Sequence, residues 1–293
     1  NSRKKHGKKI LRSGGIAIYL GILFSFILIF IGQIFQFIDI ENNKIFYLFF
    51  IGSTIFFLIG LIDDIFDVSP YLRLFFQFLT AFFICEKGLA INQLNFNVFN
   101  DNILILNLPS ALAITFGCFW ITGIVNSINW LDGLDGLASG FTSIVSSFLI
   151  LILFKSQNFE LVLIPATISG SSLGFLKNNY YPAKIFMGDS GSYLIGYSLS
   201  FISLFTFSKI SDLNGLYLDS FNLPLAILML FIPIVDMFFV VSKRLSNGKS
   251  PFFPDRSHLH HRLVDNGFTT SHTITFFYIL TLIFSFIAMY LFI

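Results

Sequence analysis

The segment IFYLFFIGSTIFFLIGLIDDIFD, residues 45–67, decides the fold class of this chain. Its first part, from Ile45 to Ile62, carries no charged side chain and is long enough to cross the hydrocarbon core of a membrane, about 30 Å, as a helix. The run ends directly in Asp63 and Asp64, with Asp67 one turn later. The segment therefore predicts a membrane-spanning helix that places a group of carboxylates at a membrane surface.

Apolar runs of this length recur along the whole chain. Of its 293 residues, 55% are hydrophobic and 12% are charged, and the mean hydropathy is +0.80. A soluble domain would carry charges on roughly a quarter of its residues. We therefore expect an all-α polytopic membrane protein with about nine transmembrane helices. The predicted spans are Gly15 to Phe37, Ile45 to Ile62, Tyr71 to Leu89, Pro109 to Ile128, Gly136 to Phe154, Leu161 to Leu176, Ser190 to Phe207, Phe221 to Val241 and Thr273 to Phe292.

The stretches between the spans define the rest of the organisation. Ile91 to Leu108 alternates apolar and polar residues and is rich in Asn, a pattern that predicts a short extracytoplasmic β-hairpin. Residues 243–272 form a long polar loop that contains His and Arg. We expect the chain, residues 1–293, to be a single integral membrane domain with this loop inside it.

The positions of Lys and Arg predict the orientation, because cytoplasmic loops are enriched in these residues. With the amino terminus inside, 14 of the 18 Lys and Arg residues fall on the cytoplasmic side, counting Arg73 at the start of the third span. The same orientation gathers all five histidines on that side, together with Asp63, Asp64, Asp67, Asp132, Asp135 and Asp189, so the chemistry is predicted to lie on the cytoplasmic face. The cytoplasmic segments are 1–14, 63–70, 129–135, 177–189 and 243–272.

Clusters of carboxylates are the first candidates for chemistry. Adjacent acids such as Asp63 and Asp64 repel each other at a membrane boundary, so they usually serve a cation or a phosphate. A solvated helix end is the alternative interpretation. A second cluster recurs every three residues before Gly136, which keeps its members near one side of a helical stretch. It could hold a divalent metal or read the edge of a base, and it consists of Asn126, Asn129, Asp132 and Asp135.

Two further segments favour phosphate. The run Phe186-Met-Gly-Asp189-Ser-Gly-Ser192 opens a predicted span, and a helix start offers free N–H groups to a phosphate, although Asp189 could be a plain helix cap. The run Pro254-Asp-Arg256-Ser-His258-Leu-His260-His261-Arg262 brings imidazoles beside guanidiniums. Arg and His facing phosphate is the preferred interpretation, because no further Cys or His ligands for zinc are near.

Together, these groups describe phosphoryl-group chemistry, with carboxylates holding Mg²⁺ against a diphosphate and basic side chains neutralising the remaining charge. Two other classes remain open: an ion-coupled membrane transporter and a non-catalytic lipid-binding protein. A transporter would place acids near the midplane of broken helices. Only Asp236 lies well inside a predicted span.

In motif content and order, the chain resembles the polyprenyl-phosphate N-acetylhexosamine-1-phosphate transferases, a family that includes MraY-type and WecA/TagO-type enzymes. The resemblance covers nearly the whole chain. The segments that carry it are Arg3-Lys-Lys-His6 with Gly14-Gly15, Asp63-Asp64-Ile-Phe-Asp67, Asn129-Trp-Leu-Asp132-Gly-Leu-Asp135-Gly-Leu-Ala, Lys184-Ile-Phe186-Met-Gly-Asp189-Ser-Gly-Ser, and His258-Leu-His260-His261.

This resemblance implies an Mg²⁺-dependent reaction, with Mn²⁺ as an alternative ion, that transfers N-acetylhexosamine 1-phosphate from a UDP-sugar to undecaprenyl phosphate and releases UMP. It would start a cell-envelope polysaccharide on its lipid carrier in the bacterial inner membrane. The implied metal ligands are Asp189 and Asn129. The implied catalytic residues are Asp63, Asp64, Asp132, Asp135, His258, His260 and His261, and the implied substrate contacts are Arg73, Asn179, Phe186, Asp67 and Arg256.

Within those sets, Phe186 would stack on uracil, Asn179 with Asp132 and Asp135 would help to hold the nucleotide, and Asp63 or Asp64 would serve the acceptor phosphate. Direct attack and a covalent phosphoryl-enzyme both remain open. No nucleic-acid partner is expected, and a homodimer is left open.

The His258 loop and the third acid, Asp67, resemble the WecA/TagO-type enzymes, which use unmodified amino sugars. UDP-GlcNAc is therefore the expected donor. Transfer of GalNAc, FucNAc or QuiNAc 1-phosphate, or of phospho-MurNAc-pentapeptide, is the alternative. Because the family has a span before the Arg-Lys-Lys-His segment, we also expect a parent protein with ten or more spans.

Overall fold

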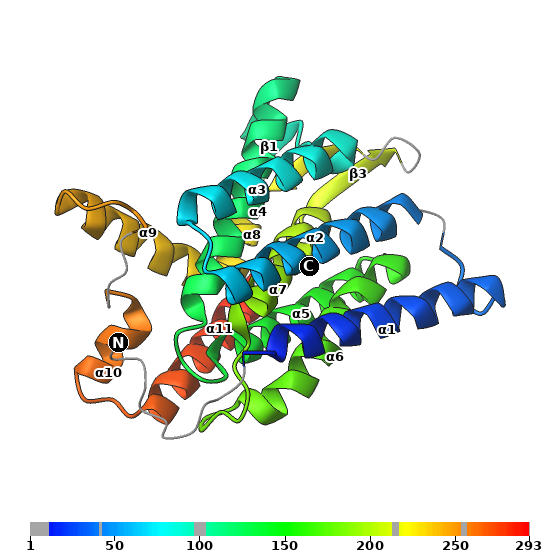
Figure 1. The fold of residues 1–293 in the computed structure, drawn as a ribbon. Coiled ribbons are helices and arrows are strands. Elements are labelled where there is room, and N and C mark those ends of the chain that lie inside the picture. Colours follow the sequence, from blue (N-terminus) through cyan, green and yellow to red (C-terminus); the bar gives the residue numbers. More distant parts are fainter. Residues whose placement is uncertain (1–11, 41–42, 97–103, 213–216, 253–256, 293) are drawn as a thin grey trace.

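The computed structural model describes residues 12–40, 43–96, 104–212, 217–252 and 257–292. Within these ranges the chain is a bundle of long helices with a small sheet at one end (Figure 1). The helices are α1 (Gly14–Ile34), α2 (Asn43–Phe66), α3 (Pro70–Ile84), the π-helical turn η1 (Cys85–Leu89), α4 (Ser110–Leu131), α5 (Leu137–Lys155), α6 (Phe159–Asn179), α7 (Gly188–Thr206), α8 (Leu223–Met229), α9 (Phe231–Ser246), α10 (Leu259–Asp265) and α11 (Thr270–Phe292).

Six of these helices are long and apolar enough to cross a membrane, or seven if α8 and α9 count as one bent span. The chain is therefore a multi-pass helical membrane protein, as the sequence predicted. Every predicted span coincides with a helix, but the count of nine is not confirmed. The segment predicted as Tyr71 to Leu89 is α3 continued by η1, and Gly88 breaks the helical geometry there with a φ of 146°. The segment predicted as Phe221 to Val241 is bent by 89° between α8 and α9.

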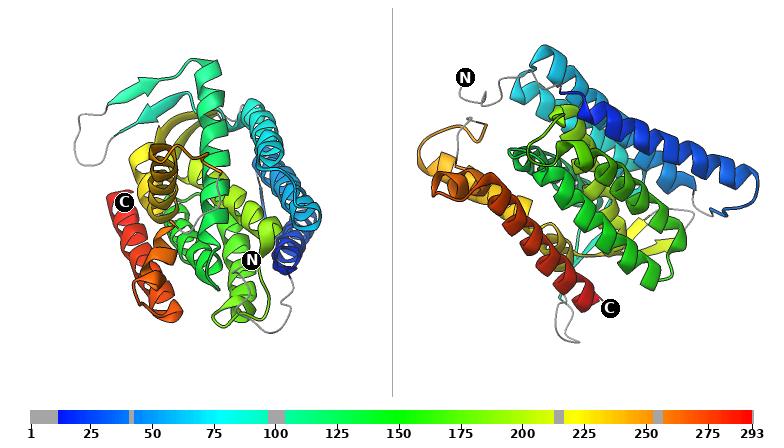
Figure 2. Two further views of the ribbon diagram at one scale, coloured as in Figure 1. Left: turned by 60° about the vertical axis from the view of Figure 1, so that its left-hand side comes forward. Right: turned by 90° about the horizontal axis from the view of Figure 1, so that it is seen from below.

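Helix α7 is the centre of the bundle. Every residue from Ser190 to Thr206 is buried, and α2, α4 and α5 surround the helix (Figures 1 and 2). Tyr197 of α7 donates a hydrogen bond to the carbonyl of Leu48 in α2, and the indole of Trp120 in α4 donates to the carbonyl of Ser200. Small and hydroxyl-bearing residues let membrane helices approach closely, and α7 is rich in both.

The sheet lies at the end of the bundle opposite the start of α7. The predicted hairpin segment contains the antiparallel pair β1 (Gln93–Asn95) and β2 (Ile105–Asn107), in which Gln93 lies opposite Asn107, and its extracytoplasmic position stays a prediction. Its tip, residues 97–103, lies outside the described residues. The sequence did not predict the other two strands, β3 (Ser208–Asp212) and β4 (Tyr217–Asn222), which complete the order β2-β1-β4-β3, with β1 and β4 parallel.

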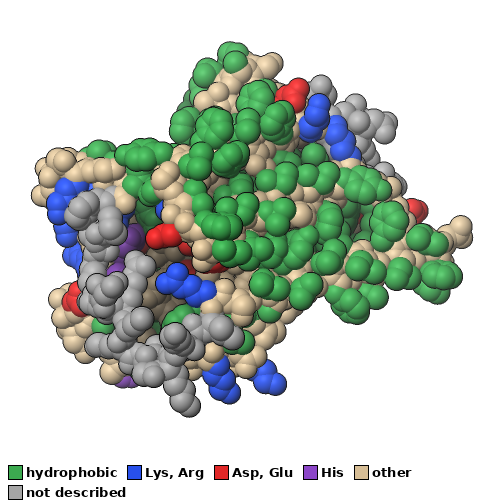
Figure 3. Space-filling view, in the orientation of Figure 1, with side chains coloured by type: hydrophobic (Ala, Val, Ile, Leu, Met, Phe, Trp, Pro, Cys, Tyr) green, Lys and Arg blue, Asp and Glu red, His purple; other side chains and the backbone are tan. Residues whose placement is uncertain are grey.

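The polar loop 243–272 also differs from the prediction. It contains the short helix α10 between the ends of α9 and α11, with residues 253–256 outside the described part. Helices α9 and α10 lie together at the left of Figure 1, and in the same view basic, acidic and His side chains gather at that side (Figure 3). Apolar side chains cover most of the remaining visible surface, as expected for a lipid-facing exterior (Figure 3).

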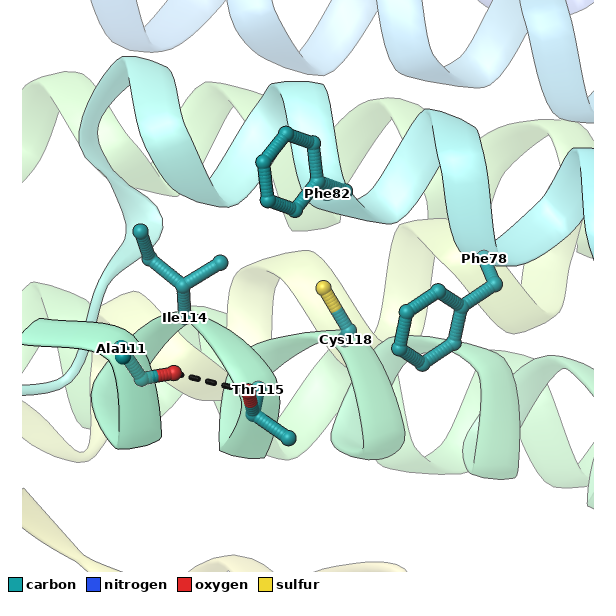
Figure 4. A pocket seen from close by; sticks show the side chains of 6 residues that line it. All are labelled: Phe78, Phe82, Ala111, Ile114, Thr115 and Cys118. Atoms are coloured by element: carbon teal, nitrogen blue, oxygen red, sulfur yellow. Dashed lines mark hydrogen bonds between the residues drawn. The ribbon is translucent and has the colours of Figure 1, made fainter.

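A shallow apolar cavity of about 290 Å³ lies between α3 and α4, on the flank of the bundle (Figure 4). The hydroxyl of Thr115 is turned back to the carbonyl of Ala111, at 2.7 Å, so it offers no free donor there. No acid or base lines the cavity, and none of the predicted site residues reaches it. The lining residues are Phe78, Phe82, Ala111, Ile114, Thr115 and Cys118.

The close approach of α2 and α7 predicts a position where a methyl group is not tolerated. A Cβ at Gly60 would collide with the backbone of Asp189 and Ser190, whereas a Cβ at Gly174 in α6 would meet nothing within 4 Å. We expect Gly60→Ala to lower the free energy of unfolding by about 1–3 kcal/mol, because a packed backbone cannot move aside. Gly174→Ala should leave it unchanged or raise it by roughly 0.5–1 kcal/mol. Thermal unfolding of the two variants in detergent tests the difference, and equal stability would contradict the packing.

Candidate active site

Asp64 caps the first turn of α7. Its Oδ1 accepts a hydrogen bond from the backbone N–H of Asp189 and its Oδ2 accepts one from Ser190, both at 2.9 Å. The first N–H groups of a helix lack partners within the helix, and the helix dipole favours a negative charge there. Gly188 precedes this turn with a φ of +76°, and a Cβ at this position would lie 2.7 Å from Asp64 Oδ2. The glycine therefore lets the carboxylate of α2 reach the backbone of α7.

Asp63 is buried and accepts from three donors. Its Oδ2 forms an ion pair with Arg73 of α3 and lies 3.4 Å from the hydroxyl of Tyr193, while its Oδ1 accepts from the backbone N–H of Val68 at 2.9 Å. Sequence reasoning missed Tyr193, because an aromatic residue in an apolar run carries no polar signal. Its position one turn after Asp189 is the feature that could have identified it.

Asn129, at the end of α4, is joined to the start of α7. Its Nδ2 donates to Asp189 Oδ1 at 2.6 Å and to the hydroxyl oxygen of Ser192 at 2.9 Å. The predicted pair of metal ligands, Asn129 and Asp189, is thus in direct contact. This bond occupies the amide nitrogen of Asn129 and leaves its carbonyl oxygen available as a ligand.

Asn179 and Asp135 join the loop after α4 to the loop before α7. Asn179 Oδ1 accepts from the backbone N–H of Gly136 at 3.1 Å and from the hydroxyl of Ser139 at 2.9 Å, and its Nδ2 donates to the carbonyl of Ile185 at 3.0 Å. Asp135 Oδ2 accepts from a backbone N–H in the second loop, that of Ala183, at 2.9 Å. The two predicted nucleotide contacts therefore hold together the loops that carry Asp132 and Phe186.

Asp132 is half-buried among other acids. Burial, together with the negative charges of Asp189, Asp135 and Asp64, raises the pKa of its carboxyl well above the ordinary value. No hydrogen bond to this carboxylate occurs within the described part of the chain. Its charge is therefore the least compensated in the cluster.

The His segment, residues 258–261, lies beside the loop that carries Asp132. His260 is buried, a Cβ at Gly133 would collide with its Nε2, and neither ring nitrogen has a hydrogen-bond partner among the described residues. Burial, and then the nearby His261 and His258, lower the pKa of His260. The rings of His260 and His261 lie 4.3 Å apart, and His258 packs edge-on against Trp130 at 5.5 Å.

Most of the predicted site residues thus meet at one end of the bundle, drawn from α2, α3, α4, α6, α7 and α10. Phe186 is half-buried, and its carbonyl accepts from the backbone N–H of Gly14 at 3.0 Å, so the start of α1 lies against this end as well. Asp67 is exposed, with a φ of +51°, and is not drawn into the cluster. Arg256 lies outside the described residues, as do the basic residues before Arg12.

A family model described as glycosyl transferase family 4 matches residues 46–207, more than half of the chain. The chain belongs to glycosyl transferase family 4. The resemblance drawn from the motifs is therefore confirmed at the level of the family. The matched region includes the acidic cluster, which consists of Asp63, Asp64, Asp132 and Asp189.

Several bacterial proteins resemble this chain over most of its length. A probable undecaprenyl-phosphate N-acetylglucosaminyl 1-phosphate transferase of Bacillus subtilis is 31% identical over 97% of this chain and 74% of its own. A decaprenyl-phosphate N-acetylglucosaminephosphotransferase of Mycobacterium tuberculosis is 32% identical over 94% and 71%. An undecaprenyl-phosphate alpha-N-acetylglucosaminyl 1-phosphate transferase of Escherichia coli is 31% identical over 92% and 69%.

The donor chemistry of the family 4 site fits a hard cation. Mg²⁺ prefers oxygen ligands, usually one or two carboxylates from the protein with water and substrate phosphate completing its shell. Asp189 and the uncompensated Asp132 supply such oxygens. Among the described residues, no group of three or more His, Cys, Asp or Glu side chains is arranged to hold a metal ion.

The geometry predicts a structural function for Asp64. In Asp64→Asn one of the two acceptor oxygens becomes a donor facing a backbone N–H, and the charge at the start of α7 is lost. We expect the free energy of unfolding to fall by roughly 1–3 kcal/mol. Asp67→Asn is the matched control, because Asp67 is exposed and Asn accepts a positive φ, so its stability should not change. Thermal unfolding in detergent is the measurement, and equal stability of both variants would contradict the cap.

Proposed function

We propose that this chain transfers N-acetylglucosamine 1-phosphate from UDP-N-acetylglucosamine to a polyprenyl phosphate and releases UMP. The observation that carries the proposal is the meeting of Asp63, Asp64, Asp132 and Asp189 with Arg73 at one end of the bundle. The names of the bacterial relatives support the acceptor and the sugar, because all three contain a polyprenyl phosphate and an N-acetylglucosaminyl group.

The proposed reaction exchanges one phosphoric anhydride bond for another. An oxygen of the lipid phosphate attacks the phosphorus that carries the sugar, and the bond from that phosphorus to the oxygen of the UMP phosphate breaks. UMP leaves with the bond electrons, and the acceptor phosphate gives up its proton if it arrives as the monoanion. Because both substrates are anionic, the chain has to offset charge and orient phosphates rather than supply new covalent chemistry.

The metal is part of the proposal. Asp189 and the carbonyl oxygen of Asn129 would hold Mg²⁺, or Mn²⁺, with Asp132 close by. When bound, the ion would neutralise charge on the diphosphate and on the leaving UMP. Arg73 contributes a further positive charge and is kept in place by Asp63.

Asp132 is the strongest candidate to take the acceptor's proton. Asp63 accepts from three donors and Asp64 from two, so both carboxylates are engaged in holding the helices. Among the described residues the carboxylate of Asp132 has no hydrogen-bond donor, so its oxygens are open to accept that proton. In this scheme Asp63 and Asp64 position Arg73 and α7, and Asp132 acts on the substrate.

Other side chains complete the proposed substrate site. Phe186 would stack on uracil, and the loops joined by Asn179 and Asp135 would hold the rest of the nucleotide. His260 and His261, with Arg256 and Asp67, would face the phosphates and the sugar. GalNAc, FucNAc or QuiNAc 1-phosphate and phospho-MurNAc-pentapeptide are the alternative groups, which a panel of UDP-sugars distinguishes.

One observation favours a transporter. Helices α8 and α9 form a broken span, and α9 carries the buried Asp236, which is the arrangement found at ion-coupling sites. The carboxylate of Asp236, however, accepts from His258 and from the backbone N–H of Leu259. It is therefore occupied by the chain itself, and the transferase remains the better proposal.

The activity assay tests the transferase directly. UMP should be released from UDP-N-acetylglucosamine only when polyprenyl phosphate is present, and mass spectrometry should identify the lipid diphosphate sugar. Asp189→Asn should lower the rate by about 10²-fold or more, because it removes a charged ligand from a largely dry site. Asp39→Asn is the matched control, since Asp39 is exposed in the loop after α1 and away from the cluster.

The outcomes of this assay separate the classes. UMP release without the lipid, or ion-driven uptake with no UMP, would contradict the transferase. A normal rate for Asp189→Asn at limiting Mg²⁺ would contradict the metal assignment while leaving the reaction class in place.

We also propose that the site faces the cytoplasm of a bacterial inner membrane, on the basis of the Lys and Arg distribution. Ser246 at the end of α9 and Ser156 at the end of α5 are both exposed. In whole cells, Ser156→Cys should react with a membrane-impermeant maleimide, and Ser246→Cys should react only after the membrane is opened. Labelling of both from outside would contradict this orientation.

A further inference from the structure

A buried acid outside the acidic cluster, Asp236 of α9, anchors the His segment. Only 2% of the residue is exposed. Its Oδ2 lies 2.8 Å from His258 Nδ1, and its Oδ1 accepts from the backbone N–H of Leu259 at 2.7 Å. Leu259 is the first residue of α10, so one carboxylate holds both the side chain and the backbone at the start of the segment that carries His260 and His261.

The second buried charge of α9, Arg244, lies at the other ring nitrogen of His258. Its Nη2 lies 3.4 Å from His258 Nε2, and its Nη1 donates to the carbonyl of Pro251. A guanidinium can only donate, so this arrangement suits the tautomer in which Nε2 accepts and Nδ1 donates to Asp236. His258 therefore bridges a buried carboxylate and a buried guanidinium, and both of its ring nitrogens are used within the chain.

Arg244 also reaches the end of α4. Its guanidinium lies 5.0 Å from the ring centroid of Trp130, and the ring of His258 packs edge-on against the same indole. Trp130 follows Asn129 directly in the chain. Asp236 and Arg244, both in α9, thus connect the His segment to the end of α4, next to Asn129.

We propose that Asp236, Arg244 and His258 form a positioning clamp that holds His260 and His261 against the loop of Asp132. His258 acts in this clamp as a connector and does not contact substrate. The part of the proposal that concerns turnover rests on the proposed transferase function, whereas the clamp itself follows from the contacts. A buried charge that loses its partner is strongly destabilised, which explains why the segment is held in one arrangement.

Kinetics of Asp236→Asn test how the clamp acts. The amide nitrogen would face the proton of His258 Nδ1, so the ring would have to release Arg244 or turn away. We expect kcat to fall by about 10–100-fold, the usual loss when the partner that orients a functional imidazole is removed, with KM for the UDP-sugar changed by less than about threefold. Lys243→Gln is the matched control, because Lys243 is the exposed neighbour of Arg244 on the same helix, and it should retain the wild-type kcat.

A double-mutant cycle decides whether Asp236 acts through His258. If it does, Asp236→Asn combined with His258→Gln should be no slower than the slower single variant. Losses that multiply, or a rise in KM with kcat retained, would overturn the clamp.

A labelling experiment tests the clamp without using turnover. Ser257 is buried beside His258, and the native Cys85 and Cys118 are buried as well. Ser257→Cys should react slowly with a maleimide in detergent, and adding Asp236→Asn should speed the reaction by about tenfold or more, with Lys243→Gln as the control. Equal labelling rates would overturn the clamp. If the wild-type chain transfers no sugar phosphate, the proposed function fails, but the labelling result still stands.

Discussion

The contact between the carboxylate of Asp64 and the first turn of α7 is the constraint on which the site depends. It joins residues 125 and 126 positions apart and brings the end of one membrane helix onto the start of another. Because the capped N–H groups belong to Asp189 and Ser190, the same contact fixes where Asp189 points. Asn129 then meets Asp189, and the loop of Asp132 follows from α4. One cap thus determines the position of the acids that are proposed to face substrate.

The carboxylates in this cluster divide into two kinds. Asp63, Asp64 and Asp135 accept hydrogen bonds from neighbouring elements and hold the structure, whereas Asp132 has no such partner among the described residues. The acids that hold the structure and the acid that is proposed to react are therefore different members of one cluster. An acid whose oxygens accept from several donors is held in place, and an acid that lacks such donors can bind a cation or a proton. The difference comes from helix geometry and not from residue type.

Much of this could be predicted from the sequence, because membrane spans and charged ends are local signals. The run ending at Asp63 marked both a helix and a group of acids, and the charge distribution gathered segments most of whose described site candidates lie at one end of the bundle. Tyr193 and Asp236 escaped notice as partners, since hydrogen bonds across 130 and 22 residues leave no local pattern. Strands β3 and β4 were missed for a related reason: pairing between distant segments is set by the arrangement of the helices around them. The division between Asp64 as a cap and Asp132 as an uncompensated acid likewise required the three-dimensional arrangement.

The burial of α7 along its whole length also bears on how the chain enters the membrane during synthesis. The helix contains Ser190, Ser192, Ser198, Ser200 and Ser203 and is not among the helices apolar enough to cross a bilayer alone. Its surroundings in the finished bundle are other helices rather than lipid, and α2, α4 and α5 are all made before it. Insertion of α7 is therefore expected to be assisted by helices already in the membrane, so biogenesis follows the order of the sequence. A defect in α2 would then reduce the yield of inserted protein as well as the stability of the folded one.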